Sequence, residues 1–377
     1  MMQIGFDAKR AFTNTSGLGN YSRFVIAGLL RLFPENYYYL FTPKLLDTFK
    51  HFHGLAAHAH LRQPQGINQV FTGLWRSFGL SSHLLKDGIK LFHGLSNELP
   101  YGISRDIKTV VTIHDLIFIR YPKLYKPIDR LIYLQKFKYA CQRADKIIAI
   151  SEQTKVDLVH YFKIKPEKIA VVYQDCDPLF HRKVPTADLT NIKQKYSLPN
   201  KYILCVGTQE PRKNQMQLLK AWHQAGLAAN LPVVFVGRQT SYTQELKQYI
   251  QRHQLAGQVL FLPYIPTAEL PAIYQLASLF VYPSVFEGFG IPVLEALNSG
   301  VPVITSTGSC FAEAGGAAAL YVAPDNIAEL AQGLQKVTAD AALRRQMIDT
   351  GFIHAQQFRS EKTITQIHQI YQELLRS

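Results

Sequence analysis

Two glutamates, eight positions apart, stand beside a glycine-rich loop in the segment FEGFGIPVLE. Glu287 follows the apolar run SLFVYPS, which predicts a strand, and Glu295 lies in the early turns of a helix that Pro292 suits as a first-turn residue. Glycines allow close approach to a ligand, and amides at a helix N-terminus favour an anion; the amides concerned are those of Phe289, Gly290 and Ile291. The segment predicts a phosphate site with two acceptors for hydroxyls, as a sugar nucleotide requires, or simply a capped helix.

Two adjacent cations, Arg212 and Lys213, lie in the segment GTQEPRKN, which follows the predicted strand YILCV. Cations at a junction of loop and helix can clamp a diphosphate leaving group and stabilise its charge without a metal. Because adjacent side chains often point apart, the two cations are not expected to serve equally. The alternative is a solvated pair on the surface.

A histidine, His114, ends the β-favouring run TVVTI and is followed by Asp115. Ligands of parallel α/β sheets bind outside the carboxyl ends of the strands, so His114 is expected to face a ligand and to donate to a sugar hydroxyl. The alternative is a structural histidine that bonds to the neighbouring backbone.

The segment GLGNYS supplies Gly17 and Gly19 but has Ser22 where a dinucleotide fingerprint has its third glycine. We interpret it as a flexible loop whose amides meet a diphosphate, with a plain helix-entry loop as the alternative.

Metal ligation has little support in the sequence. The sequence DCD at Asp175–Asp177 is the only D-x-D pattern, and it lies between the two predicted domains rather than in a loop suited to a Mg²⁺-diphosphate. The histidines of HFHGLAAHAH, residues 51–60, could chelate zinc or nickel, but a surface loop near an acceptor is the preferred interpretation. No metal is therefore expected.

Short apolar strands alternate with helical patterns along both halves, which predicts two parallel sheets flanked by helices. The strands of the first half are expected at Gln3–Asp7, Tyr37–Phe41, Leu91–His93, Thr109–His114, Lys146–Ile150 and Lys168–Val172. Those of the second half are expected at Tyr202–Val206, Pro232–Val236, Val259–Phe261, Leu279–Val281, Val301–Thr305 and Leu320–Val322. The predicted fold class is α/β, with two Rossmann-like domains, residues 1–185 and 186–357, facing a central cleft. A C-terminal helix, residues 358–377, is expected to cross back to the first domain.

The chain of 377 residues carries a net charge of +14, with 24 basic against 14 acidic residues in 1–180 and 17 against 13 in the remainder. Such a surface attracts phosphates of a small molecule, an anionic lipid or a nucleic acid, or it is simply solvated. The four cysteines lie far apart, no apolar run is long enough to span a bilayer, and the N-terminus does not resemble a signal peptide. The expected location is cytoplasmic.

The segment FEGFGIPVLEALNSGVPVITS resembles the E-x7-E motif of retaining glycosyltransferase family 4, whose members have the GT-B fold. Further blocks resemble that family in the same order along nearly the whole chain: IGFDAKRAFTNTSGLGNYSR, VVTIHDL, ADKIIAISEQTKVDL, YILCVGTQEPRKNQMQLLKAW and AEAGGAAALYVAPD. The subgroup most similar in pattern includes mannosyltransferases of O-antigen assembly.

This resemblance implies roles for the candidate residues. Glu287 and His114 would contact the donor sugar, Glu295 the ribose, and Lys213 the diphosphate. Many relatives carry an arginine where this chain has Thr208, so Arg212 or another residue must supply the second cation. Gly17 and Gly19 would belong to the family's glycine loop. Catalytic contacts are thus expected from Glu287, His114 and Lys213.

The resemblance further implies a metal-independent hexosyltransferase that uses a nucleoside diphosphate sugar, GDP-mannose by its subgroup, as co-substrate. The acceptor would be a glycan, or a glycan on a polyprenyl diphosphate at the inner face of the plasma membrane, with peripheral contact to anionic lipid and no nucleic acid. Two alternatives are a GT-B sugar-nucleotide epimerase, which needs no acceptor, and a non-enzymatic basic binding protein.

Overall fold

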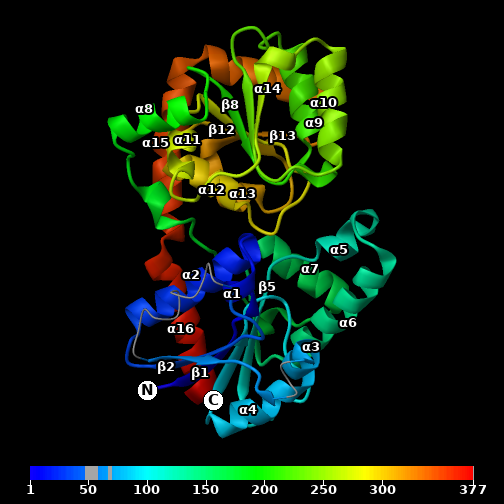
Figure 1. The fold of residues 1–377 in the computed structure, drawn as a ribbon, viewed down its shortest axis with the longest axis vertical. Coiled ribbons are helices and arrows are strands. Elements are labelled where there is room, and N and C mark those ends of the chain that lie inside the picture. The colour runs from blue at the N-terminus through cyan, green and yellow to red at the C-terminus, as the bar shows by residue number, and fades with distance from the viewer. Residues whose placement is uncertain (47–57, 67–69, 377) are drawn as a thin grey trace. The chain divides into compact units, whose positions relative to one another are not determined.

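The computed structural model describes residues 1–46, 58–66 and 70–376. The chain forms two compact units, which we describe separately (Figure 1). Unit 1 consists of residues 1–174 together with 359–377, and unit 2 of residues 175–358. Unit 2 begins before the predicted boundary at 185/186. The reason is that residues 175–185 pack on unit 2: the Phe180 ring meets the Tyr274 ring edge-on at 5.3 Å, and the Val184 amide donates to Gln275.

Unit 1 contains a parallel sheet of seven strands in the order β3-β2-β1-β4-β5-β6-β7. Its strands are β1 (Gln3–Asp7), β2 (Tyr37–Phe41), β3 (Ala59–Arg62), β4 (Leu91–Gly94), β5 (Lys108–Ile113), β6 (Lys146–Ala149) and β7 (Ile169–Val171). Its helices include α1 (Lys9–Thr13), α2 (Gly17–Leu32), α3 (Thr72–Leu74), α4 (Leu80–Lys86), α5 (Ile117–Arg120), α6 (Pro127–Arg143), α7 (Glu152–Phe162) and α16 (Ser360–Arg376). The central strands are buried on both faces, as parallel sheets require.

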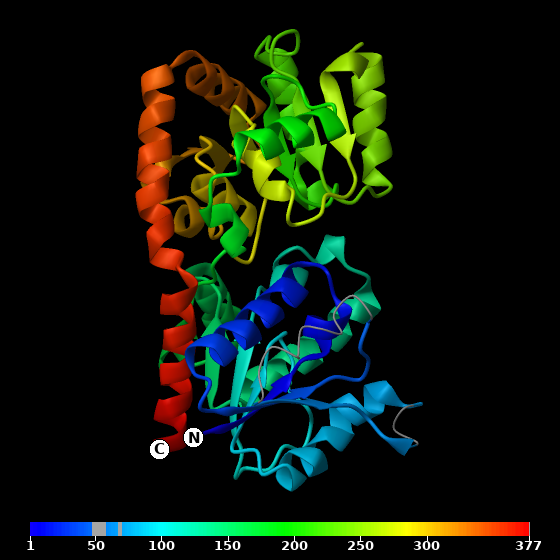
Figure 2. The same cartoon turned by 60° about the vertical axis from the view of Figure 1, so that its left-hand side comes forward.

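Helix α16 packs against α2 within unit 1, and the two lie side by side in both views (Figures 1 and 2). The contact is close because α2 has Gly28 there: a Cβ at that position would lie 2.5 Å from the Ile364 side chain. The Phe33 ring stacks on His368 at a centroid distance of 3.5 Å, and Arg31 pairs with Glu361 at 2.9 Å. Helix α16 is therefore part of the core of unit 1.

Unit 2 contains a parallel sheet of six strands in the order β10-β9-β8-β11-β12-β13. Its strands are β8 (Ile203–Val206), β9 (Val233–Val236), β10 (Val259–Leu262), β11 (Leu279–Tyr282), β12 (Val303–Ser306) and β13 (Ala319–Val322). Its helices are α8 (Thr186–Lys195), α9 (Gln215–Gln224), α10 (Tyr242–Arg252), α11 (Leu270–Gln275), α12 (Ile291–Asn298), α13 (Phe311–Gly315), α14 (Ile327–Ala339) and α15 (Ala341–Ala355), with the 3-10 turns η7 (Pro178–His181) and η8 (Pro211–Lys213). Every predicted strand is present within two residues of its expected bounds.

One strand, β3, was not predicted: its residues Ala59–Arg62 fall at the edge of a segment that the sequence suggested was a surface loop. That interpretation is wrong for Ala59 and His60, which pair with β2; the histidine-rich sequence gives no sign of this pairing. The His60 ring lies 4.9 Å from the ring of Tyr39 and 6.1 Å from that of Tyr37. His51 and His53 lie outside the described residues. Among the helices described, none is both long and apolar enough to cross a membrane.

Candidate active site

In the sheet of unit 2, the order of the strands reverses between β8 and β11. These two strands are neighbours in the sheet, although β9 and β10 lie between them in the sequence. Ligands of open α/β sheets bind at this kind of switch point, outside the carboxyl ends of the strands. The loop after β8 carries Arg212 and Lys213, and the loop after β11 carries Glu287. The order of the strands therefore brings the predicted cations to the predicted acid.

The loop after β11 is fixed by hydrogen bonds to Ser309 and Cys310, the two residues that precede α13. The amide of Glu287 donates to Ser309 Oγ at 3.1 Å, and that hydroxyl lies 3.0 Å from the Glu287 carbonyl oxygen. The Cys310 thiol donates to the same carbonyl at 3.3 Å. Ser309 has a φ of 51°, a left-handed conformation that serine seldom adopts. The Glu287 backbone is thus held by the loop between β12 and α13.

Both cations reach the Glu287 carboxylate. Lys213 Nζ and Arg212 Nη1 each lie 2.7 Å from Oε1. The expectation that these adjacent side chains point apart is wrong, because the 3-10 turn η8 presents both of them to the loop after β11. Three more groups complete the cluster: the Tyr282 hydroxyl accepts from Lys213 at 2.6 Å, the Ser284 hydroxyl donates to Glu287 at 2.5 Å, and Glu210 accepts from Arg212 at 2.7 Å.

The charges of this cluster stabilise one another. Burial alone would raise the pKa of Glu287, but Lys213 and Arg212 outweigh it and lower the pKa to about 2. Burial alone would lower the pKa of Arg212, but Glu287 and Glu210 outweigh it, so this pKa lies above its ordinary value. Glu287 is therefore an ionised carboxylate throughout the physiological range, although only 9% of it is exposed.

The second acid, Glu295, has a different environment. It lies on α12, and its Oε2 accepts a hydrogen bond from the Tyr274 hydroxyl at 2.7 Å. Burial raises the pKa of Glu295 to about 7, with a smaller contribution from Asp177 and an opposing one from the bond to Tyr274. The two acids of the motif therefore differ in charge near neutral pH: Glu287 stays ionised, whereas Glu295 titrates.

Helix α12 begins after Gly290, whose φ of 102° is open to glycine but strained for other residues. No side chain caps this N-terminus. Phe289 is buried, and the centroid of its ring lies 5.4 Å from that of Phe358, so this side chain fixes the loop to the interior of unit 2. The geometry at Gly290 and Ile291 is that of an uncapped helix start, where amides favour an anion.

In unit 1, His114 follows β5 and is 6% exposed. Its Nε2 donates to the Leu95 carbonyl at 2.9 Å, and its amide donates to Asn97 at 2.7 Å. Burial lowers the pKa of His114 to about 4. His114 is thus a neutral imidazole that donates from Nε2, which leaves Nδ1 as an acceptor. The bond from Nε2 to Leu95 agrees with the alternative prediction of a histidine that bonds to the neighbouring backbone. The nitrogen that remains for a ligand accepts a hydrogen bond, whereas a donor was expected.

The two glycines predicted to lie in a flexible loop both lie in the first turn of α2, so that the helix-entry alternative describes their backbone. Gly19 is buried on α2, and a Cβ there would lie 1.9 Å from the Asn14 carbonyl oxygen. Gly17, the first residue of the same helix, is exposed, with nothing within 4 Å of an added Cβ. Gly19 is therefore required by the close packing of α2 against Asn14, whereas an added Cβ at Gly17 would enter open space.

Several polar residues around the candidates were not singled out from the sequence. Tyr282, Ser284 and Ser309 surround Glu287; the first two stand in the same segment, YPSVFEG, and their closeness to the acid was a usable signal. Behind His114 lies a buried chain of side chains from four elements. The Tyr21 ring meets His114 edge-on at 4.7 Å, and the further members follow in the order Tyr21, Thr112, His93 and Tyr371, at distances of 3.1, 2.9 and 2.5 Å. No short motif links these residues.

Comparison with known proteins identifies the family. Residues 38–177 match the family model described as Glycosyltransferase Family 4, and residues 189–353 match that of Glycosyl transferases group 1. The O-antigen chain mannosyltransferase B of Escherichia coli is 30% identical over 288 residues, which cover 75% of this chain and 74% of that protein. The chain belongs to glycosyltransferase family 4. The sequence-based family prediction is thereby confirmed.

Other relatives and structures agree. The O-antigen chain mannosyltransferase RfbU of Salmonella typhimurium is 32% identical over 57% of each chain, and the serotype-specific mannosyltransferase WbdA of E. coli is 29% identical over 69% of this chain but only 33% of its own length. The solved structure of WaaG, a glycosyltransferase involved in lipopolysaccharide biosynthesis, matches with a TM-score of 0.73 at 16% identity over 97% of this glycosyltransferase and 99% of WaaG. The structure of Anabaena Alr3699/HepE in complex with UDP matches with a TM-score of 0.75 at 17% identity, over 99% of this chain and 100% of that protein. These likenesses confirm the predicted GT-B fold.

The charge cluster of this glycosyltransferase generates a prediction about stability. Replacing Glu287 by Gln leaves two buried cations with one acid fewer, so unit 2 should lose about 3–5 kcal/mol of unfolding free energy at pH 7. The pKa of Glu287 is lowered, so its contribution is complete above its ordinary pKa of 4.5 and is lost as pH falls toward 2. The difference between wild type and variant should therefore shrink by about 1.4 kcal/mol between pH 7 and pH 3.5.

Denaturant unfolding at several pH values measures this difference. The exposed acid Glu245 on α10 provides a matched control, Glu245→Gln, whose effect should be small. An equal loss for Glu287→Gln at both pH values would contradict the assignment of an ionised, paired carboxylate.

Proposed function

We propose that this family 4 enzyme is a retaining, metal-independent hexosyltransferase that moves mannose from GDP-mannose to a glycan or lipid-linked acceptor in cell-surface polysaccharide synthesis. The single observation that carries the proposal is the convergence of Arg212 and Lys213 on Glu287 at the switch point of unit 2. Family membership supports the reaction class. The names of the mannosyltransferase relatives support the sugar and the pathway class.

In the proposed reaction the bond between the anomeric carbon and the diphosphate oxygen breaks, and a bond from that carbon to an acceptor hydroxyl oxygen forms on the same face of the sugar. The acceptor's proton passes to the departing diphosphate oxygen. Two cations are suited to the charge that develops on this leaving group, because fixed charges in a site poor in water stabilise it without reorganisation. Arg212 and Lys213 would supply them, together with the amides at the start of α12.

The remaining candidates are assigned to the rest of the donor. Glu295 would accept from ribose hydroxyls. Glu287 would accept from hydroxyls of the sugar while it keeps the cations in place, and it is not assigned as a nucleophile. His114 would contact the sugar through Nδ1, the nitrogen that the Leu95 bond leaves as an acceptor. Gly17, with open space before it, and the amides near Gly19 would approach the diphosphate.

Binding of donors by calorimetry, without added metal, tests the proposal. We expect one of GDP-mannose, UDP-glucose, UDP-galactose and UDP-N-acetylglucosamine to bind in the micromolar range, with GDP-mannose as the expected one. Lys213→Ala should weaken that binding about tenfold or more, because a cation that meets a diphosphate is lost. Glu287→Ala should weaken it as well.

The control is Lys195→Ala, which removes a lysine of unit 2 that pairs with Glu269 at 2.8 Å on the surface. Exposed pairs contribute little, so this variant should bind donors as wild type does. If no donor binds, or if Lys213→Ala and Lys195→Ala behave alike, the transferase site is not where we place it. Turnover of the donor without any acceptor would instead indicate the epimerase.

The pKa of Glu295 generates a second prediction. Ribose hydroxyls donate to the ionised carboxylate, and its pKa of about 7 means that the ionised fraction falls between pH 8 and pH 6. The dissociation constant of the donor should therefore rise about tenfold over that interval. Glu295→Gln should bind more weakly at pH 8 and show a flat profile, and a steep profile that persists in this variant would contradict the role of Glu295.

Contact with an anionic membrane is also part of the proposal, and helix α6 supports it. The first half of this helix exposes apolar side chains: Ile128 is 74% exposed and Leu131 57%, with Ile132 and Leu134 also on the surface. Exposed lysines accompany them at 123, 126 and 138. A surface that combines apolar groups with basic ones fits the interface of an anionic bilayer at the inner face of the plasma membrane.

Sedimentation with vesicles tests this contact. The protein should bind vesicles of phosphatidylcholine that contain phosphatidylglycerol, and much less to phosphatidylcholine alone. The double variant Ile128→Glu/Leu131→Glu should lose most of this binding. Val156→Glu is the control, since Val156 on α7 is an apolar residue of unit 1 that is as exposed as Leu131. Equal binding by both variants would contradict the assignment of α6.

A further inference from the structure

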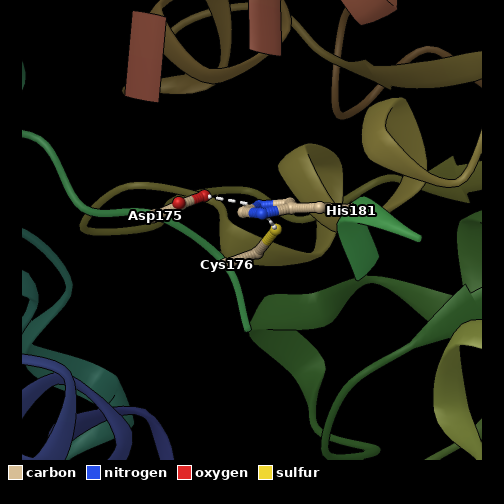
Figure 3. A group of neighbouring side chains, drawn as sticks. All are labelled: Asp175, Cys176 and His181. Carbon is tan, nitrogen blue, oxygen red and sulfur yellow. Dashed lines mark hydrogen bonds and ion pairs between the residues drawn. The ribbon is translucent and has the colours of Figure 1, made fainter. Parts of the chain in front are cut away.

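Three side chains of different chemistry converge at the start of unit 2: Asp175, Cys176 and His181 (Figure 3). His181 Nε2 lies 3.0 Å from Asp175 Oδ1 and 3.6 Å from Cys176 Sγ. All three ligand atoms lie within 4.8 Å of one another. The group is distinct from the Glu287 cluster and is the one group of this kind among the described residues.

The spacing of these atoms suits a tetrahedral ion. With bonds of about 2.0–2.1 Å to nitrogen or oxygen and about 2.3 Å to sulfur, the ligand atoms of a zinc site lie roughly 3.3–3.7 Å apart. The separation of Nε2 and Sγ is within this range, and that of Nε2 and Oδ1 is slightly shorter. Two of the three separations therefore lie in or near this range, and the third, between Oδ1 and Sγ, is no more than 4.8 Å.

The chemistry of the group points to the same class of ion. A thiolate, an imidazole and a carboxylate are the ligands of Zn²⁺, whereas Mg²⁺ prefers oxygen alone. Asn298 Nδ2 on α12 donates to Cys176 Sγ at 3.4 Å, and such a donor stabilises a sulfur that carries negative charge. The Asp175 side chain is fully buried and 17% of the His181 side chain is exposed, so water can reach the group on the side of His181.

The segment that carries the group is held firmly. Asp177 caps the turn η7 by accepting from the Leu179 amide at 3.0 Å. Phe180 packs edge-on against Tyr274, the residue that bonds Glu295. The group thus occupies a fixed position beside α12, as a binding site for an ion requires.

We propose that Asp175, Cys176 and His181 bind one divalent transition-metal ion of the zinc class, with a water molecule as fourth ligand. Binding displaces the thiol proton of Cys176 to solvent and moves the imidazole proton of His181 from Nε2 to Nδ1. The ion cross-links the two ends of the segment 175–181 and has no part in the transfer chemistry of the Glu287 cluster. The proposal does not depend on the proposed function.

Titration of chelator-treated protein with Zn²⁺ and Co²⁺ tests this proposal. We expect one ion per chain, an absorption band of a cobalt–thiolate bond, and a higher melting temperature with Zn²⁺. Cys176→Ser and His181→Ala should each weaken binding about 100-fold or more, and Asn298→Ala about tenfold, since the last removes only a supporting bond. Cys141→Ala, at a buried cysteine of unit 1, is the control and should bind as wild type does.

Circular dichroism establishes that each variant is folded, and Asp175→Asn provides a variant of nearly unchanged shape that should also weaken binding. The proposal is overturned by the absence of stoichiometric binding, by a cobalt spectrum without the thiolate band, or by binding that Cys176→Ser and His181→Ala leave unchanged.

Discussion

The ionised carboxylate of Glu287 is the constraint on which unit 2 of this glycosyltransferase depends most. Arg212 and Lys213 are both largely buried, and burying a cation is costly unless an acid compensates it. Glu287 compensates both through one oxygen atom, and the Ser309 contacts hold its backbone where it can do so. Without that acid, the two cations could not occupy the switch point of the sheet together.

Unit 1 uses the opposite electrostatic design at the end of β5. There His114 is neutral, and burial also lowers the pKa of His93, to about 3. The polar chain from Tyr21 to Tyr371, against which the His114 ring packs, therefore consists of uncharged groups that satisfy one another's hydrogen bonds. A buried network of this kind fixes the orientation of its members, because each unsatisfied partner would cost free energy. Unit 2 thus stabilises its cluster by paired charges, whereas unit 1 relies on neutral hydrogen-bonded groups.

Much of this could be predicted from the sequence, because the parallel strands are short apolar runs and the E-x7-E segment places an acid directly after one of them. The edge strand β3 could not, since His60 and Arg62 interrupt any apolar pattern and the strand depends on pairing with β2. The approach of Arg212 to Glu287 was also beyond prediction, because it depends on the 3-10 turn η8. The grouping of Asp175 with His181 depends in the same way on the turn η7.

The packing of α16 on α2 has a consequence for how the protein is made. Residues 359–377 leave the ribosome after all of unit 2, yet Ile364 fills the space over Gly28 and Tyr371 bonds His93 in unit 1. Domains tend to fold as units while the chain is synthesised. Unit 2 can therefore complete its core first. Unit 1 keeps an apolar face of α2 uncovered until α16 has been synthesised.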